Sequence, residues 1–266
     1  MSKIAAIQMC STSHVPDNLY FVEQQIEIAA AQGATLAVLP EMFGYIGSSS
    51  AHVLSITETP GSGPIQDCLA SLSQKHKIWI VGGTIPLAAH DHNKAKAACL
   101  VFDSDGAQVG RYDKMHLFDA QVSTQEHYKE SHTIAPGDKL CVIDTPVGKL
   151  GLCVCFDIRF PEIFIQLSAL GAEIIAIPAA FTAITGKAHW ELLARCRAID
   201  GFSYIVGACQ GGVHPTGRVT HGHSMIVDPW GDIIAQITDP TQQIIYADID
   251  LKRFYEVRAK IPHGER

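Results

Sequence analysis

Two short apolar runs, each ending in a proline, constrain the fold of this chain most strongly. Residues 35–39 read TLAVL and precede Pro40, and residues 173–178 read EIIAIP. A near-continuous apolar run of this length is typical of a strand that is buried on both faces. Each run follows a segment whose apolar residues recur with helical spacing, namely residues 19–30 and 163–170. The sequence therefore predicts strands that alternate with helices, in sheets that are covered on both sides.

The remaining segments extend this pattern over the whole chain. Residues 78–85 and 95–102 are predicted to be strands, and Asp105-Gly106 is a tight-turn signal before a further strand. Residues 233–237 and 243–249 are predicted to form a hairpin. Helices with strands and hairpins indicate an α/β protein with a mixed sheet. The two halves show only weak similarity, so we predict no repeat, and without a linker we predict a single domain over residues 1–266.

Composition excludes several classes of protein. Apolar residues make up 47% of the chain and charged residues 18%, which is enough for a large core. The formal charge of −7 argues against nucleic acid as a partner. No apolar run reaches the length needed to cross a membrane, so we expect no membrane partner. The first residues, MSKIAAIQMC, enter a strand without a signal-peptide pattern, so we expect a cytoplasmic protein.

The eight cysteines lie mostly within apolar strand or helix patterns, which favours reduced thiols over disulfides. Closely spaced pairs of metal-binding residue types occur, but without the spacing of a structural zinc site. These pairs are Cys153 with Cys155, His90 with His92, and His221 with His223. We therefore expect neither a metal nor another cofactor.

Cys155 occupies the most informative position in the chain. Residues 149–162 read KLGLCVCFDIRFPE, in which an apolar alternation predicts a strand and Pro161 opens a helix. A cysteine at such a junction lies at the carboxyl edge of the sheet. The amino terminus of a helix there favours a thiolate and offers N–H groups to an oxyanion. The alternative is a buried structural cysteine, which is common, and which we expect for the neighbouring Cys153.

Two further segments help to decide whether Cys155 is a catalytic or a structural cysteine. Residues 35–41 (TLAVLPE) end in Glu41, and residues 110–119 (GRYDKMHLFD) contain Lys114. With CFDIRFPE, these segments resemble the carbon–nitrogen hydrolase (nitrilase) superfamily, whose members use a Glu–Lys–Cys triad. Without the resemblance, Glu41 and Lys114 would be interpreted as exposed residues in a turn and a loop.

Carried over position by position, the resemblance assigns the triad to Glu41, Lys114 and Cys155. It also implies an α/β fold of the nitrilase type, a four-layer α-β-β-α sandwich, in a protein that is usually a homodimer. The long polar segment 117–137 is predicted to be a functional loop. Within it, the pattern ES-x-T-x-x-PGD implies that Glu130 supports the lysine.

The residue types explain the chemistry that the resemblance implies. A cysteine thiolate attacks an amide carbonyl and splits hydrolysis into two steps through a thioester. Glu41 would accept the thiol proton, pass it to the leaving group and then activate water. Lys114 and the backbone N–H of Phe156 would stabilise the oxyanion. Phe156 stands where many relatives carry tyrosine, which is a mild departure from the pattern.

Later segments indicate the small-molecule substrate. Residues 181–200 and 221–236 resemble the small-amidase branches of the family, and residues 210–223 (QGGVHPTGRVTHGH) are most similar to deaminated glutathione amidases. The resemblance implies hydrolysis of deaminated glutathione to 2-oxoglutarate and cysteinylglycine. The alternatives are an ω-amidase acting on α-ketoglutaramate, another hydrolase acting on a carbamoyl amide or a nitrile, and a catalytically dead binding protein on the same fold.

Residues that would contact the substrate are predicted on several segments. Arg159 can form a bidentate pair with a substrate carboxylate or, alternatively, an i, i+3 pair with Glu162. Phe181 and Thr185 resemble pocket positions of the amidase branches. In the glycine-rich loop that follows, His214 and Arg218 are placed to contact the peptide-like end of a longer substrate.

Overall fold

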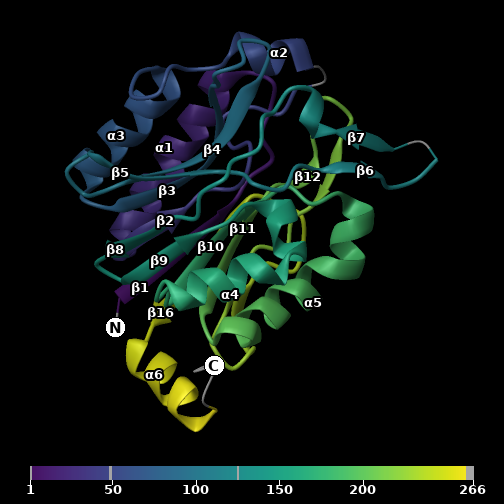
Figure 1. Ribbon diagram of the computed structural model, residues 1–266. Helices are drawn as coiled ribbons and strands as arrows, with labels where there is room; N and C mark the ends of the chain where they lie inside the picture. The colour runs from purple at the N-terminus through teal and green to yellow at the C-terminus, as the bar shows by residue number, and fades with distance from the viewer. Residues whose placement is uncertain (1, 48–49, 125, 262–266) are drawn as a thin grey trace.

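The computed structural model describes residues 2–47, 50–124 and 126–261. Two six-stranded sheets lie face to face, with helices on the outer side of each (Figure 1). Helices α1 (Val15–Ala31) and α3 (Pro64–His76) cover the first sheet. Helices α4 (Pro161–Ala169) and α5 (Ala183–Gly201) cover the second. The predicted four-layer α-β-β-α sandwich is confirmed.

The strands of the first sheet are, in spatial order, β16 (Gln243–Ile249), β1 (Ser2–Gln8), β2 (Ala34–Val38), β3 (Trp79–Ala88), β4 (Ala95–Phe102) and β5 (Gln108–Asp113). Those of the second are β15 (Ile233–Gln236), β14 (Met225–Val227), β11 (Tyr204–Cys209), β10 (Ile174–Ala179), β9 (Gly148–Leu152) and β8 (Val142–Thr145). Two small hairpins are β6 (Asp119–Gln121) with β7 (His127–Lys129), and β12 (Gly211–Val213) with β13 (Val219–His221). The other helices are α2 (Ser50–Ser55), α6 (Leu251–Lys260) and the 3₁₀ turns η1 (Glu130–His132) and η2 (Cys155–Arg159).

The two sheets have the same order of parallel and antiparallel strand pairs when the first is read from β16 to β5 and the second from β8 to β15. In the first, β1, β2 and β3 are parallel, and β16, β4 and β5 add antiparallel edges. In the second, β9, β10 and β11 are parallel, and β8, β14 and β15 add antiparallel edges. The internal similarity that the sequence does not show is therefore present in the topology.

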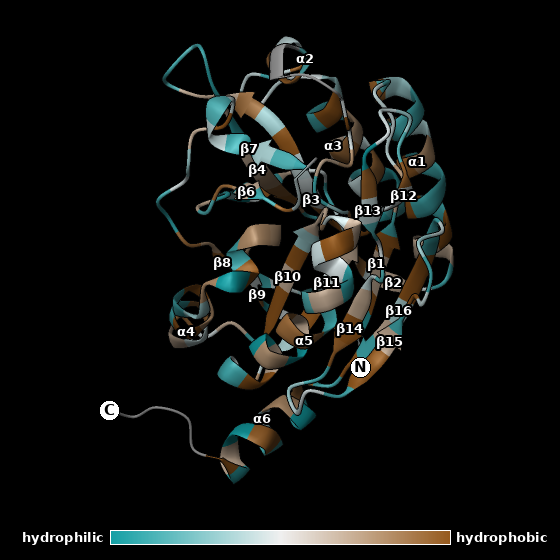
Figure 2. Ribbon diagram, turned by 90° about the vertical axis from the view of Figure 1, so that its right-hand side faces the viewer, coloured by the Kyte–Doolittle hydropathy of each residue, from teal (hydrophilic) through white to brown (hydrophobic). Residues whose placement is uncertain are grey.

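The apolar runs form strands that are buried on both faces. In β2, Leu36 and Val38 belong to the core between the sheets, whereas Ala37 packs with the helices outside. This division follows from the alternation of side chains along a strand. Figure 2 shows apolar residues concentrated along strands such as β10 and β14. In the described part of the chain, no helix has both the length and the apolarity needed to cross a membrane.

Three features differ from the prediction. Residues 233–237 and 243–249 do not pair as the predicted hairpin, because β15 pairs with β14 in the second sheet and β16 pairs with β1 in the first. The strand expected over residues 149–155 ends at Leu152, because the chain leaves the sheet and enters η2 at Cys155. Residues 117–137, expected to be a loop, contain the β6–β7 hairpin and η1. The strands of this hairpin are short and mostly exposed, so they lack the apolar alternation that marks a half-buried strand.

Candidate active site

The three residues of the predicted triad follow three different strands and line one cavity. Glu41 follows β2, Lys114 follows β5, and Cys155 follows β9, so that residues from both sheets meet. The sheets are joined nearby, where the N–H of Met9 donates to the carbonyl of Cys209 (3.2 Å). The cavity has a volume of about 490 Å³, which lies within the usual range for small-molecule sites.

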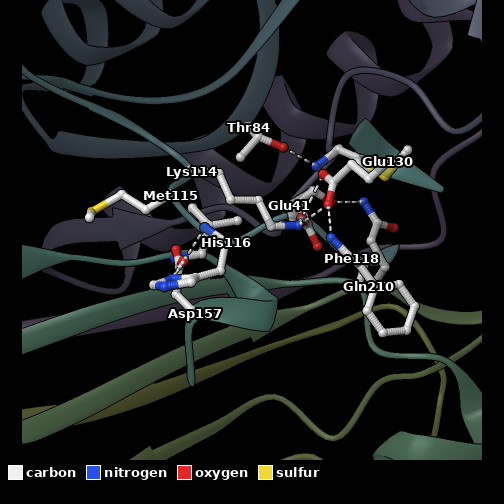
Figure 3. A network of polar contacts seen from close by, with 12 residues as sticks. Glu41, Thr84, Lys114, Met115, His116, Phe118, Glu130, Asp157 and Gln210 are labelled. Atoms are coloured by element: carbon white, nitrogen blue, oxygen red, sulfur yellow. Dashed lines mark hydrogen bonds and ion pairs between the residues drawn. The ribbon is translucent and has the colours of Figure 1, made fainter. Parts of the chain in front are cut away.

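Lys114 lies between the carboxylates of Glu41 and Glu130 (Figure 3). Its Nζ donates to Glu41 Oε1 (2.7 Å) and to Glu130 Oε2 (2.8 Å) and Oε1 (3.0 Å). The lysine is only 2% exposed and Glu41 only 4%. The alternative of a solvated loop lysine is therefore wrong, and the structure brings Glu41, Glu130 and Lys114 together.

The charge of Lys114 is maintained by its neighbours. Desolvation lowers the pKa of this lysine, but Glu130 and then Glu41 more than offset it, and the net effect raises the pKa well above its usual value. Lys114 therefore stays a cation. Glu130 has a second task, because its Oε2 also accepts a hydrogen bond from the backbone N–H of Phe118 (2.6 Å).

Cys155 is buried at the start of η2 with a φ of 46°. Few residues other than glycine adopt this left-handed conformation, and it is typical of constrained functional positions. Burial and the adjacent Glu41 raise the pKa of the Cys155 thiol well above its usual value, although Lys114 and the N–H of Ala180 act in the opposite direction. The thiolate expected at a helix terminus is thus not favoured before substrate binds, and the thiol needs a base beside it.

A buried aspartate connects the Cys155 turn to the Lys114 loop. Asp157 Oδ2 accepts from the N–H of Val154 (2.9 Å) and from the hydroxyl of Tyr112 (2.7 Å). Its Oδ1 accepts from the N–H of His116 (2.9 Å), as Figure 3 shows. Sequence reasoning missed this residue. The available signal was an aspartate two residues after Cys155, within the strand–helix junction.

The backbone around Glu41 is held by a second buried network. Gln210 Nε2 donates to the Glu41 carbonyl (3.1 Å) and to the hydroxyl of Ser11 (2.8 Å). The next residue, Met42, has a φ of 58°, and its N–H donates to Thr84 Oγ1 (3.0 Å). Gly83 allows this approach, since a Cβ there would lie 1.8 Å from the Pro40 carbonyl oxygen. Neither Gln210 nor Thr84 was predicted from the sequence.

Of the residues predicted to contact substrate, Arg159, Phe181, Thr185 and Arg218 line the cavity, as does the predicted oxyanion donor Phe156. The Arg159 guanidinium lies 5.8 Å from the Phe156 ring centroid and 5.5 Å from that of Phe181. Its Nη2 is 3.2 Å from His189 Nδ1. Arg159 and Glu162 are both described by the structure, and they do not form the alternative i, i+3 ion pair. Burial lowers the pKa of Arg159.

Two other residues singled out in the sequence, Cys153 and His214, are buried and do not line the cavity. Cys153 is fully buried in the core, as expected. His214 is buried and hydrogen-bonded through Nδ1 to the Ser11 carbonyl (2.8 Å) and through Nε2 to Thr220 Oγ1 (2.7 Å), so it does not line the cavity. Within the described residues, no three His, Cys, Asp or Glu side chains are placed to hold a metal ion.

A two-sheet sandwich that places a cysteine, a glutamate and a lysine in one cavity defines a carbon–nitrogen hydrolase. The chain belongs to this family: the carbon–nitrogen hydrolase family model matches residues 3–259. Among known relatives, deaminated glutathione amidase of Yersinia enterocolitica is 42% identical over 243 residues, which is 90% of this chain and 83% of that protein. Human omega-amidase NIT2 is 35% identical over 260 residues, which is 98% of this chain and 92% of that protein.

Solved structures agree with this assignment. Saccharomyces cerevisiae Nit3, a member of branch 10 of the nitrilase superfamily, has a TM-score of 0.89 at 32% identity, covering 100% of this chain and 96% of that one. The C. elegans NitFhit protein also has a TM-score of 0.89, at 33% identity, covering 99% of this chain. The present chain spans 65% of the length of NitFhit.

Proposed function

We propose that the protein is a cysteine-dependent amidase that hydrolyses deaminated glutathione, a small 2-oxo acid amide, to 2-oxoglutarate and cysteinylglycine. The observation that carries this proposal is the placement of Cys155 beside Glu41 and Lys114 in one cavity. The relatives named as amidases of 2-oxo acid amides support the choice of substrate.

In the first half of the reaction, Glu41 accepts the proton of the Cys155 thiol while the sulfur attacks the amide carbonyl. The raised pKa of the thiol makes this transfer necessary, because little thiolate exists beforehand. Lys114 and the Phe156 N–H stabilise the oxyanion of the tetrahedral intermediate. Glu41 then gives the proton to the departing amine, and the 2-oxoglutaryl group remains on sulfur as a thioester through its C5 carbonyl.

In the second half, Glu41 takes a proton from water, which attacks the thioester carbonyl. Collapse of this second intermediate releases 2-oxoglutarate, and the proton returns to the Cys155 sulfur. Glu130 touches neither reacting atom in this scheme. It keeps Lys114 charged and fixed, through the contacts that join them.

A second candidate function is ω-amidase activity on α-ketoglutaramate. It is favoured by the similarity to human omega-amidase NIT2 and needs the same three residues. A hydrolase of carbamoyl amides or nitriles would also use them. A catalytically dead binding protein on this fold would have no need for the buried Lys114 between two carboxylates, since buried charges are costly to retain.

The test is the release of 2-oxoglutarate from deaminated glutathione and from α-ketoglutaramate, measured in parallel for the wild type and Cys155→Ala. We expect turnover by the wild type, with preference for deaminated glutathione, and none by the variant. Preference for α-ketoglutaramate would assign the protein to the ω-amidases. Turnover that survives in Cys155→Ala would refute the mechanism.

We further propose a cytoplasmic homodimer with no nucleic-acid or membrane partner. Large apolar side chains are exposed on the outer helices of the second sheet, and solvent-exposed apolar clusters commonly mark protein interfaces. The residues concerned on α4 and α5 are Ile165, Ile184, Leu192 and Ile199.

A further inference from the structure

Three polar atoms on the cavity wall lack hydrogen-bond partners. Among the described residues, six buried side-chain nitrogen or oxygen atoms have no partner, and three of these residues line the cavity: Tyr45 (hydroxyl), Thr216 (Oγ1) and Arg218 (Nε). Buried polar groups in folded proteins are nearly always satisfied. Thr216 and Arg218 belong to one turn, between β12 and β13, so that two of the three atoms are close in sequence.

The contacts that Arg218 makes with other described residues are to neutral groups. Its Nη2 donates to the carbonyl of Ala180 (3.0 Å), and its Nη1 lies 3.6 Å from Met42 Sδ. The guanidinium carbon lies 5.2 Å from the ring centroid of Tyr128, in the β6–β7 hairpin. In the described part of the chain, the arginines that form ion pairs are Arg111, Arg195, Arg197 and Arg253. The charge of Arg218 is thus uncompensated.

Arg159 is the second such arginine in the same cavity. Its contacts are two aromatic rings and a histidine nitrogen, and it is also absent from those ion pairs. Partly buried guanidinium groups without carboxylates require an anionic partner, because isolated charge is costly to desolvate. Guanidinium groups bind carboxylates in a bidentate fork. Two arginines that form no ion pair with another described residue thus line one cavity.

The positions of the two arginines relative to the triad assign the carboxylates to different ends of the substrate. Arg159 closes the same 3₁₀ turn that Cys155 opens, so it lies on the side of the acyl group that stays on sulfur. Arg218 contacts Met42, the neighbour of Glu41, which protonates the leaving amine. Arg218 therefore lies on the side of the departing amine.

We propose that Arg218, with the hydroxyl of Thr216, binds a carboxylate on the leaving amine and so selects amides of amino acids or short peptides over primary amides. This inference rests on the proposed function and deepens it. Ammonia, the leaving group of a primary amide, has no group for Arg218 to bind. A peptide-like leaving group that ends in a carboxylate satisfies both the charge and the unpartnered atoms.

The test uses two substrates that differ only at this carboxylate: deaminated glutathione and its derivative with a carboxamide in place of the glycine carboxylate. For the wild type we expect kcat/KM to be about 10–100-fold higher for the acid, as a charged hydrogen-bonded pair allows. In Arg218→Gln the acid should fall to the level of the carboxamide.

The matched control is Arg195→Gln, which removes an arginine charge away from the cavity and should retain the preference for the acid. An equal loss of activity towards both substrates in Arg218→Gln, or an unchanged preference, would overturn the proposal. The same pair of ligands is to be measured by calorimetric binding to Cys155→Ala and to Cys155→Ala with Arg218→Gln. If the wild type hydrolyses neither, the proposed function fails, while the binding preference still decides the role of Arg218.

Discussion

Lys114 carries a buried charge that two carboxylates on separate segments stabilise. Glu41 comes from the end of β2 and Glu130 from η1, and both lie within 3.0 Å of the lysine nitrogen. Replacing Lys114 with Met would leave the buried carboxylate of Glu41 and the partly buried carboxylate of Glu130 without their cation. Breaking a buried pair in this way costs about 3–5 kcal/mol of unfolding free energy.

We therefore expect Lys114→Met to unfold at clearly lower urea concentration than the wild type and to lose at least about 100-fold in kcat, because an oxyanion donor is also lost. Glu130→Gln is the milder comparison, since its amide oxygen can still accept from the Phe118 N–H. A Lys114→Met protein as stable as the wild type would contradict the interpretation that this ion cluster holds the site together.

His221 gives a prediction about acid stability. It stacks on His223, with ring centroids 4.0 Å apart, and desolvation, followed by the charge of His223, lowers the pKa of His221 to about 4. The unfolded chain, with a histidine pKa near 6.5, binds this proton more readily than the folded protein. The stability that the neutral ring contributes is thus complete above pH ~6.5 and is lost as the pH falls towards 4.

In His221→Asn, stability should decrease less between pH 7 and pH 4.5 than in the wild type. The ring is only partly buried, so we expect a difference of about 1 kcal/mol after allowance for solvent screening. Urea unfolding at the two pH values measures it. Parallel losses in both proteins would show that His221 titrates normally in the folded state.

At the scale of elements, the turn at Cys155 combines a reactive residue with an unfavourable backbone conformation. The φ of 46° suits glycine, whereas a residue with a Cβ is strained there by about 1 kcal/mol. We expect Cys155→Gly to be more stable than Cys155→Ala by roughly 0.5–1 kcal/mol, with both inactive. Thermal unfolding of the two variants is the measurement, and a more stable alanine variant would show that the turn relaxes on substitution.

Local patterns in the sequence predicted the elements that have a clear apolar pattern, but not the contacts between elements. Strand β2 was predictable because its apolar run is contiguous. The role of Asp157 was not, because its partners Tyr112 and His116 lie 45 and 41 residues away. The pair of Arg159 with Glu162 was a local inference and is not formed, because Arg159 turns towards His189 on another helix. The triad itself came from the resemblance, not from periodicity.

At the scale of the whole molecule, the exposed apolar residues of α4 and α5 predict that the protein forms a homodimer through these helices. Leu192 is 70% exposed on α5, and three further large apolar side chains on α4 and α5 are also exposed. Leu192→Glu should convert the proposed dimer into a monomer, because it places a charge in the interface. Light scattering after size-exclusion chromatography gives the mass. A wild-type monomer, or a variant that remains dimeric, would show that this surface is not a dimer interface.

The pairing of β1 with β16 joins the two ends of the chain. Ser2 lies opposite Ile249 and Gln8 opposite Gln243, while the other strands of the first sheet all lie before residue 114. A protein truncated after residue 242 would expose the unpaired edge of β1, and exposed edges promote aggregation. We expect this truncated protein to be insoluble on expression, and a soluble, folded product would show that β16 is dispensable.

During synthesis, the same pairing delays folding. Five strands of the first sheet leave the ribosome early, yet the edge beside β1 stays open until residues 243–249 emerge. A nascent chain therefore exposes the unpaired edge of β1 until residues 243–249 emerge, and such edges favour aggregation during synthesis.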